Sequence, residues 1–198
     1  MLISKHTSRI AVVGATVALA AGTVLVATPA DAAVKSVKTG FTCQSDFGPQ
    51  SFDITTKMDL PAKVKKGKTV PGKPVKLVAA ISSDTADLLR TIGAKYISVT
   101  ADKTVASAGS TKIPVAGVHS PKTKVPASGG FTVTSKGTAA DFSIKKPGKY
   151  AVKIPTKFLF SITQYTDQFP DGAPLLQNAQ CAADKGEPTK ISTLKVTK

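Results

Sequence analysis

The stretch "SFDITTKMDL", residues 51–60, decides the fold class, because apolar and polar side chains alternate along it. One face carries Phe52, Ile54 and Met58, and the other carries Asp53 and Lys57. A period of two with one apolar and one polar face is typical of a half-buried antiparallel strand. The stretch therefore predicts a β-strand that packs one face on a core and turns its lysine outward.

The same alternation recurs along most of the chain. Clusters of glycine and proline such as "KKGKTVPGKP", residues 65–74, stand between the alternating segments and supply turns. Many short strands at this spacing predict an all-β domain, a β-sandwich. The further segments are 75–81, 97–101, 131–133, 142–144, 150–154 and 158–162.

The alternation also predicts which side chains are inside. A slip of one residue would exchange the two faces of a strand, so the two sets test the strand assignments. We expect Phe52, Ile54, Leu77, Ile81, Val99, Phe131, Val133, Phe142, Val152 and Ile154 to be buried, and Lys57, Lys76, Lys136, Lys145 and Lys153 to be exposed.

One segment, "SSDTADLLRTIGAK" at residues 82–95, breaks the pattern. Ser83 or Asp84 can cap a helix, Leu88 and Ile92 recur at helical spacing, and Gly93 can end it. We expect one short helix that crosses between sheets.

The first 32 residues have the features of a secretory signal. Lys5 and Arg9 precede an uncharged run over residues 10–26, and Ala30 and Ala32 form an A-x-A cleavage site. The alternative is a retained membrane anchor, for which the run is at the short limit. We expect residues 1–32 to be a signal peptide and 33–198 to be a single secreted domain, either released or loosely associated with the cell surface, with no transmembrane segment after cleavage.

The chain has two cysteines, Cys43 and Cys181, near the two ends of the expected domain. An even pair in an oxidising compartment predicts one disulfide. The alternative, a redox or metal site of two free thiols, has no C-x-x-C spacing and no nearby histidine to support it.

The chain is strongly basic, with a formal net charge of +15. Beyond the signal segment the only arginine is Arg90, so the charge comes from lysine. Lysine is a point charge without the planar fork that reads bases, and the chain has no tryptophan, which argues against sequence-specific nucleic-acid recognition. The charge favours an anionic partner, while the alternative is that lysine keeps exposed strands soluble.

Residues that could support catalysis or hold a metal are sparse. His119 is the only histidine after the signal segment and Glu187 the only glutamate. The loop "DQFPDG" at residues 167–172 lacks the ligand spacing of an EF-hand, and no phosphate-binding glycine loop occurs. The sequence favours a protein that is not an enzyme, and predicts no cofactor and no metal.

Five features of the chain are shared with a known family. They are "GFTC" (40–43), "TADLLRTIGAKYISVTA" (85–101), "KVPASGGFTVTSKGTA" (124–139), "KPGKYAVKI" (146–154) and Cys181. Together they resemble the secreted actinobacterial immunoglobulin-like domain proteins of unknown function. The resemblance covers nearly all of the chain after the signal, and implies an immunoglobulin-like sandwich with a disulfide that joins the terminal regions, but no catalytic residues. A fainter likeness is to a small secreted immunoglobulin-like antioxidant protein of skin actinobacteria, in which loop tyrosines are implicated.

Two segments are candidate binding regions. One is the lysine-rich connection 61–76; the other is 161–181, which we interpret as a long loop that either packs on the sheet edge or forms an exposed tip. The leading hypothesis is a binding module for an anionic surface polymer or lipid, and the alternative is a radical-scavenging or cofactor-binding antioxidant. The candidates for the first function are Lys63, Lys65, Lys66, Lys68, Lys73 and Lys76, and those for the second are Tyr165, Tyr96 and Tyr150.

Overall fold

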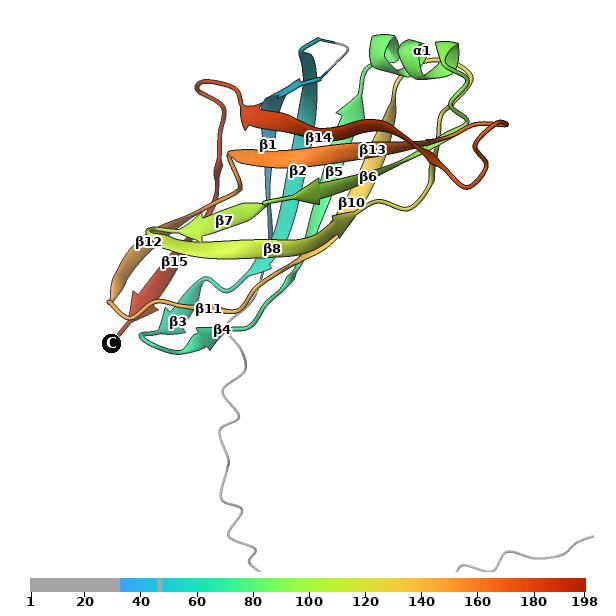
Figure 1. Cartoon of the computed structure of the whole chain (residues 1–198). Coiled ribbons are helices and arrows are strands. Elements are labelled where there is room, and N and C mark those ends of the chain that lie inside the picture. The colour runs from blue at the N-terminus through green and yellow to red at the C-terminus, as the bar shows by residue number, and fades with distance from the viewer. Residues whose placement is uncertain (1–32, 46–47) are drawn as a thin grey trace, which may run out of the picture.

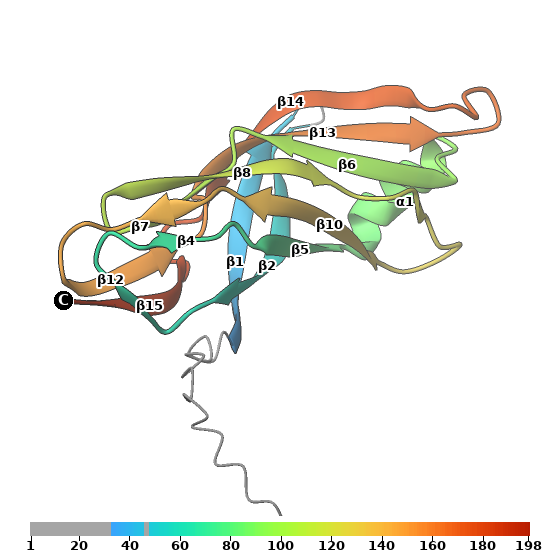
Figure 2. The ribbon, with the colours of Figure 1, turned by 90° about the horizontal axis from the view of Figure 1, so that it is seen from below.

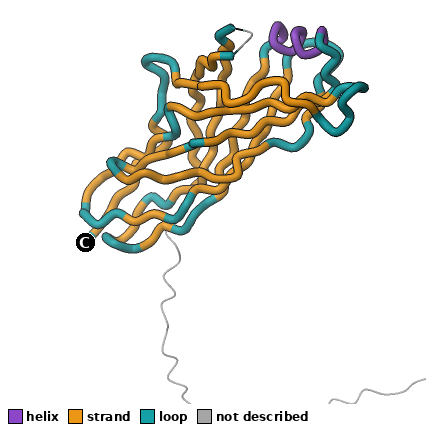
Figure 3. Tube along the Cα trace, viewed as in Figure 1, coloured by secondary structure: helices purple, strands orange, loops and turns teal. Residues whose placement is uncertain are grey.

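The computed structural model describes residues 33–45 and 48–198, and the predicted signal peptide, 1–32, lies outside this part of the chain. Figure 1 shows that the described residues form strands throughout, apart from one helix near one end. Figure 3 shows the same arrangement by secondary structure, with the strands joined by turns and loops and the helix at one end. The all-β fold class with one short helix is therefore confirmed.

Eight antiparallel strands form a closed ring. Around the ring they follow the order β8, β10, β5, β2, β1, β14, β13, β6, and β6 pairs back to β8. The sequence predicts a sandwich of two sheets; the structure has one continuous ring because Thr100 and Ala101 of β6 pair with His119 and Val118 of β8. The strands span Ala33–Gln44 (β1), Gln50–Leu60 (β2), Pro74–Ile81 (β5), Tyr96–Asp102 (β6), Thr111–His119 (β8), Phe131–Ala139 (β10), Lys157–Tyr165 (β13) and Ala173–Ala183 (β14).

Four further strands extend the sheet from β8 in the order β7, β12, β15, β3. The last of these pairings, β15 with β3, is parallel. Figures 1 and 2 place the extension and the C-terminus at one end of the molecule and the helix at the other. The remaining elements are β3 (Lys63–Lys65), β7 (Val105–Ala108), β12 (Gly148–Lys153) and β15 (Lys190–Thr197), the small pair β4 (Thr69–Val70) and β11 (Phe142–Ser143), and β9 (Thr123–Lys124), which pairs with β6.

The helix α1 spans Ser83–Thr91. The sequence predicts Ser83 or Asp84 as its cap, but the cap is Ser82, whose side chain accepts a hydrogen bond from the backbone N–H of Thr85. The helix ends at Thr91 with Ile92 as its C-cap, and Gly93 follows with φ 75°, a left-handed conformation that glycine adopts without strain.

The disulfide between Cys43 and Cys181 is confirmed. The two residues lie directly opposite each other in the register of β1 and β14, so the bond is a cross-strand link in the wall of the ring. The interpretation of 161–181 as a long loop is wrong: most of it forms the hairpin of β13 and β14, and only residues 166–172 connect them. Phe169 lies at the tip of this connection and is exposed.

The predicted faces are correct, but the interior is less tightly filled than the sequence predicts. The five lysines expected outside are all exposed. Val133, Phe142, Val152 and Ile154 are buried as expected. The prediction of full burial is wrong for the other six, which are only half-buried: Phe52, Ile54, Leu77, Ile81, Val99 and Phe131. The first five are half-buried because they line a cavity inside the ring, and Phe131 packs at the rim.

Candidate functional site

The lysine-rich connection 61–76 is an ordered part of the sheet extension. Its residues Lys63–Lys65 form β3, which pairs with β15. The turn that follows is held by two hydrogen bonds, since the backbone N–H of Lys66 donates to the carbonyl oxygen of Thr197 at 2.8 Å and that of Gly67 to Ile144 at 2.9 Å. Part of the connection is therefore fixed in place, because the backbone N–H groups of Lys66 and Gly67 are bonded to β15 and to the segment before β12.

Strand pairing brings two further lysines to this connection. In the register of the extension, Lys63 of β3 lies beside Lys195 of β15, and Lys195 lies opposite Lys149 of β12. Residues directly paired across neighbouring strands point to the same face, and neighbouring strands lie about 4.8 Å apart. The three exposed lysines thus form one row across the sheet, which we call the lysine row (Lys63, Lys195, Lys149).

The lysine row takes part in no ion pair among the described residues, although Asp141 Oδ1 accepts a hydrogen bond from the backbone N–H of Gly72 at 2.6 Å. The segments 61–76, 142–156 and 188–198, which build this end of the molecule, contain no aspartate or glutamate. Three ion pairs occur within the residues described, and they use Lys38, Arg90 and Lys95, which lie elsewhere. The positive charge here is therefore not neutralised within the chain. We call this surface the lysine end, and it consists of Lys63, Lys65, Lys66, Lys68, Lys145, Lys146, Lys149 and Lys195.

The structure separates the last two predicted lysines from the others. Lys73 is half-buried just before β5. Lys76 lies within β5, opposite Lys57 of β2 on one side and Lys136 of β10 on the other. These three form a second row on the outer wall of the ring, which we call the ring row (Lys57, Lys76, Lys136), and His119 of β8 continues it. The cluster predicted from the sequence is thus divided between two surfaces.

Lys149 and Lys195 are not among the lysines predicted from the sequence. They lie far from residue 63 along the chain, and only the pairing of β12, β15 and β3 brings them together. A further group that was not predicted, Lys103, Lys157 and Lys185, borders a cleft of about 510 Å³ on the outer face of β1, β13 and β14. Asp184 lines the same cleft, so its charge is mixed.

The three candidate tyrosines occupy two places. Tyr96 and Tyr165 are opposite each other in β6 and β13, while Tyr150 lies in β12 of the extension. Tyr165 is half-buried; its hydroxyl lies 3.2 Å from Ser98 Oγ, and Lys122 Nζ lies 4.0 Å from its ring centroid. The Tyr150 hydroxyl donates to the carbonyl oxygen of Lys146 at 2.9 Å. Of the three, Tyr96 is the most open to solvent.

The residues that the sequence analysis set aside stay dispersed. His119 Nδ1 lies 2.8 Å from the carbonyl oxygen of Gly117, and Glu187 Oε2 accepts from the backbone N–H of Gly40 at 3.0 Å. In the described part of the chain, no three histidine, cysteine or acidic side chains come together as metal ligands do. Within residues 33–45 and 48–198, no helix is long and apolar enough to cross a membrane.

The fold and the site together define a disulfide-bridged, all-β domain with a strongly cationic end. A family model matches residues 40–192, which is most of the chain, and the protein belongs to that family, DUF6801, a family of unknown function. Neither the curated proteins nor the solved structures contain a significant match.

Proposed function

We propose that the protein is a secreted, non-enzymatic binding module that holds a linear anionic polymer at the lysine end. The observation that carries this proposal is the gathering of eight exposed lysines at the lysine end, three of which, Lys63, Lys195 and Lys149, lie in register on neighbouring strands. Like charges directly opposite each other destabilise a sheet. An array that costs stability and makes no ion pair among the described residues is a feature that an anionic ligand would neutralise.

The geometry suits a polymer that runs across the strands. At about 4.8 Å per strand, the row presents three ammonium groups along a line of about 10 Å. Lys65 follows Lys63 by two residues on the same face of β3, and the turn residues Lys66 and Lys68 extend the charge beyond the row. Successive phosphate or sulfate groups of one chain would meet successive lysines, and each of these ion pairs would release condensed counterions.

A polymer is favoured over a lipid surface. A protein that inserts into a membrane needs exposed apolar side chains beside its charges. The large apolar side chains exposed in the described residues lie on other elements, and none belongs to β3, β12 or β15. Anionic vesicles are therefore the comparison in the test below, rather than the proposed partner.

The test compares the two rows of lysines. One variant changes Lys63, Lys149 and Lys195 to serine, and its matched control changes the ring row, Lys57, Lys76 and Lys136, to serine. Both lose the same formal charge. Binding to heparin and to a poly(glycerol phosphate) teichoic acid is measured against NaCl concentration, with phosphatidylglycerol vesicles alongside.

We expect the lysine-row variant to lose affinity. The plot of its log K against log salt should be less steep by about 2, because three lysines no longer displace counterions from the polymer. The ring-row variant should keep most of its affinity, and the vesicles should bind more weakly than either polymer. Equal reductions in affinity from the two variants would mean that net charge alone attracts the polymer. Absence of binding to both polymers at low salt would refute the proposal outright.

Three finer predictions from the sequence stay predictions. Secretion is supported by the signal-like segment and by the disulfide, which is a bond of oxidising compartments. The immunoglobulin-like relationship rests on the resemblance alone. The antioxidant alternative rests on Tyr165, Tyr96 and Tyr150, and a radical-scavenging activity unchanged in Tyr165→Phe would remove the role assigned to that side chain.

A further inference from the structure

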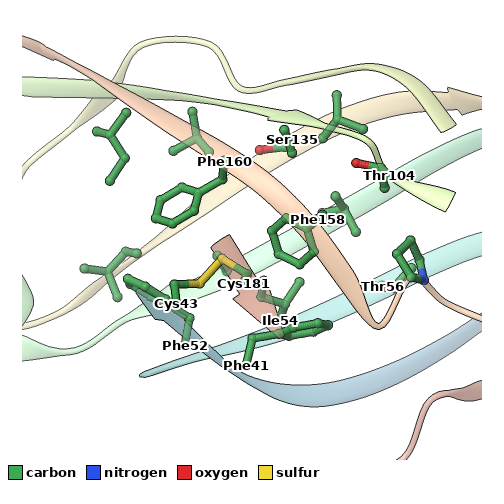
Figure 4. Close-up of a pocket in the computed structure, with 18 of the residues that line it drawn as sticks. Phe41, Cys43, Phe52, Ile54, Thr56, Thr104, Ser135, Phe158, Phe160 and Cys181 are labelled. Atoms are coloured by element: carbon green, nitrogen blue, oxygen red, sulfur yellow. A yellow bond between two sulfur atoms is a disulfide. The ribbon is translucent and has the colours of Figure 1, made fainter. Parts of the chain in front are cut away.

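The ring encloses an apolar cavity of about 90 Å³. The hydrophobic core is split into two clusters: a large one that includes Phe41 and Phe160, and a smaller one around Leu89 and Ile97 at the helix end. Figure 4 shows phenylalanine rings and the disulfide on the wall of this cavity. Members of both clusters line the cavity, and half-buried apolar side chains from several ring strands face it.

A second space adjoins the cavity on the side of the helix. It has a volume of about 280 Å³ and lies beside α1, and its lining shares Cys43, Phe52, Phe160 and Ile162 with that of the inner cavity. The two spaces therefore adjoin at these four side chains, and we call them together the path between the interior and the rim of the ring. Together they reach the lower end of the volumes found for small-molecule sites, about 300 Å³.

Apolar side chains also lie exposed at the outer end of this path. Leu88 and Ile92 both line the second space, and they are 55% and 42% exposed. They are four residues apart in sequence, so they share one face of the helical turn. The opposite side of the helix packs on the smaller core cluster through Leu89, which is buried. A ligand that runs along the path would cover both exposed side chains and fill the interior with one continuous apolar surface.

The lining of both spaces carries no charged side chain. The inner cavity has only the hydroxyls of three residues as polar side chains, and the outer space adds hydroxyls and one amide at its rim. An ionised head group brought there would lose water without gaining a counter-charge, which is costly. A neutral head group can be hydrogen-bonded. The polar residues of the outer space are Ser45, Gln50, Thr85 and Thr91.

We propose that the interior of the ring binds an amphipathic molecule with a single hydrocarbon chain and an uncharged head, with the chain inside and the head at the rim beside α1. This site is at the end of the molecule opposite the lysine end (Figures 1 and 2), and it does not depend on the polymer-binding function. The chemical class is that of a monoacylglycerol or a fatty alcohol.

The test uses the neutral dye N-phenyl-1-naphthylamine, which fluoresces when it enters an apolar site. Displacement is measured with 1-monolaurin and, as the charged analogue of the same chain length, with laurate at pH 8, all below their critical micelle concentrations. We expect the dye to bind and monolaurin to displace it, with laurate at least tenfold weaker. No dye binding, or laurate equal to monolaurin, would overturn the proposal.

Two variants on neighbouring positions of β5 locate the site. Ala79 lines the inner cavity, whereas Ala80 is exposed on the opposite face of the same strand. Ala79→Leu should lower dye affinity at least fivefold, and Ala80→Leu should leave it unchanged. Equal reductions from the two variants would overturn the assignment to the interior.

A third variant avoids the core altogether, in case Ala79→Leu impairs folding. Leu88→Asp places a charge at the exposed mouth, and should weaken monolaurin at least fivefold without changing the circular dichroism spectrum. Unchanged affinity would place the ligand elsewhere. Dye binding that is retained in the lysine-row variant separates this proposal from the polymer-binding one, because the two can then fail independently.

Discussion

Replacing Lys195 by glutamate should make the protein more stable while weakening its binding to an anionic polymer. Lys195 is the central member of the lysine row, with Lys63 on one side and Lys149 on the other. In the native chain both cross-strand pairs join like charges. In Lys195→Glu both join opposite charges, and the fold around them is unchanged because all three side chains are exposed.

The size of the gain follows from these two cross-strand pairs. A pair of opposite charges directly across neighbouring strands contributes about 0.2–1 kcal/mol, and a like-charge pair costs a similar amount. Because all three side chains are exposed, water screens their charges, and each contribution lies near the lower limit of this range. With both pairs changing sign, we expect a net gain of about 1 kcal/mol, which raises Tm by about 2–4 °C for a domain of this size.

Thermal unfolding followed by circular dichroism in low salt measures this gain. Lys195→Gln should give about half of it, since it removes the repulsion and adds no attraction. The matched control is Lys112→Glu, in which an exposed lysine opposite Ser107 changes charge in the same way. In 1 M NaCl, where the Debye length is about 3 Å, the gain should nearly vanish. A Tm that is unchanged or lowered in low salt, or equally raised in Lys112→Glu, would refute the reasoning.

Three further changes test the fold. The double variant Cys43→Ala, Cys181→Ala removes the disulfide, whose two cysteines are 138 residues apart in sequence. It should lower the free energy of unfolding by up to about 5 kcal/mol in chemical denaturation. A decrease below about 1 kcal/mol would contradict the role of the disulfide as a constraint on the unfolded chain. Ser82→Ala should cost about 1 kcal/mol by the same measurement, because the cap of α1 is removed, whereas Ser83→Ala should be nearly neutral. Gly130→Ala should lower Tm, because its Cβ would lie 2.4 Å from the carbonyl oxygen of Ile81; a wild-type Tm would contradict this close approach.

Local pattern predicted the strands well because their alternation is a property of adjacent residues. In "SFDITTKMDL" each apolar residue does face inward and Lys57 does face outward. The disulfide was also predictable, since only two cysteines are present. The helix was predicted with its cap misplaced by one or two residues, because Ser82, Ser83 and Asp84 are all competent caps and only the backbone conformation selects one of them.

Non-local pairing is what the sequence could not predict. Nothing near Lys63 in the sequence indicates that Lys195 and Lys149 will be its neighbours, since this depends on the register of three separate strands. Likewise, the pairing of β6 with β8 closes the ring, and an alternating pattern is the same for a strand in a sandwich or in a ring. The cavity follows from that closure, because the circumference of the ring sets a space that the available side chains do not fill.

The most direct test of polymer binding at the lysine end is the acetylation of individual lysines, read by mass spectrometry with and without bound teichoic acid. An amine that touches the polymer reacts slowly, while an exposed amine elsewhere keeps its rate. We expect Lys63, Lys149 and Lys195 to be protected together, and Lys57, Lys76 and Lys136 of the ring row to react as they do in the free protein. Equal protection of the two rows, or protection of the ring row alone, would contradict the account.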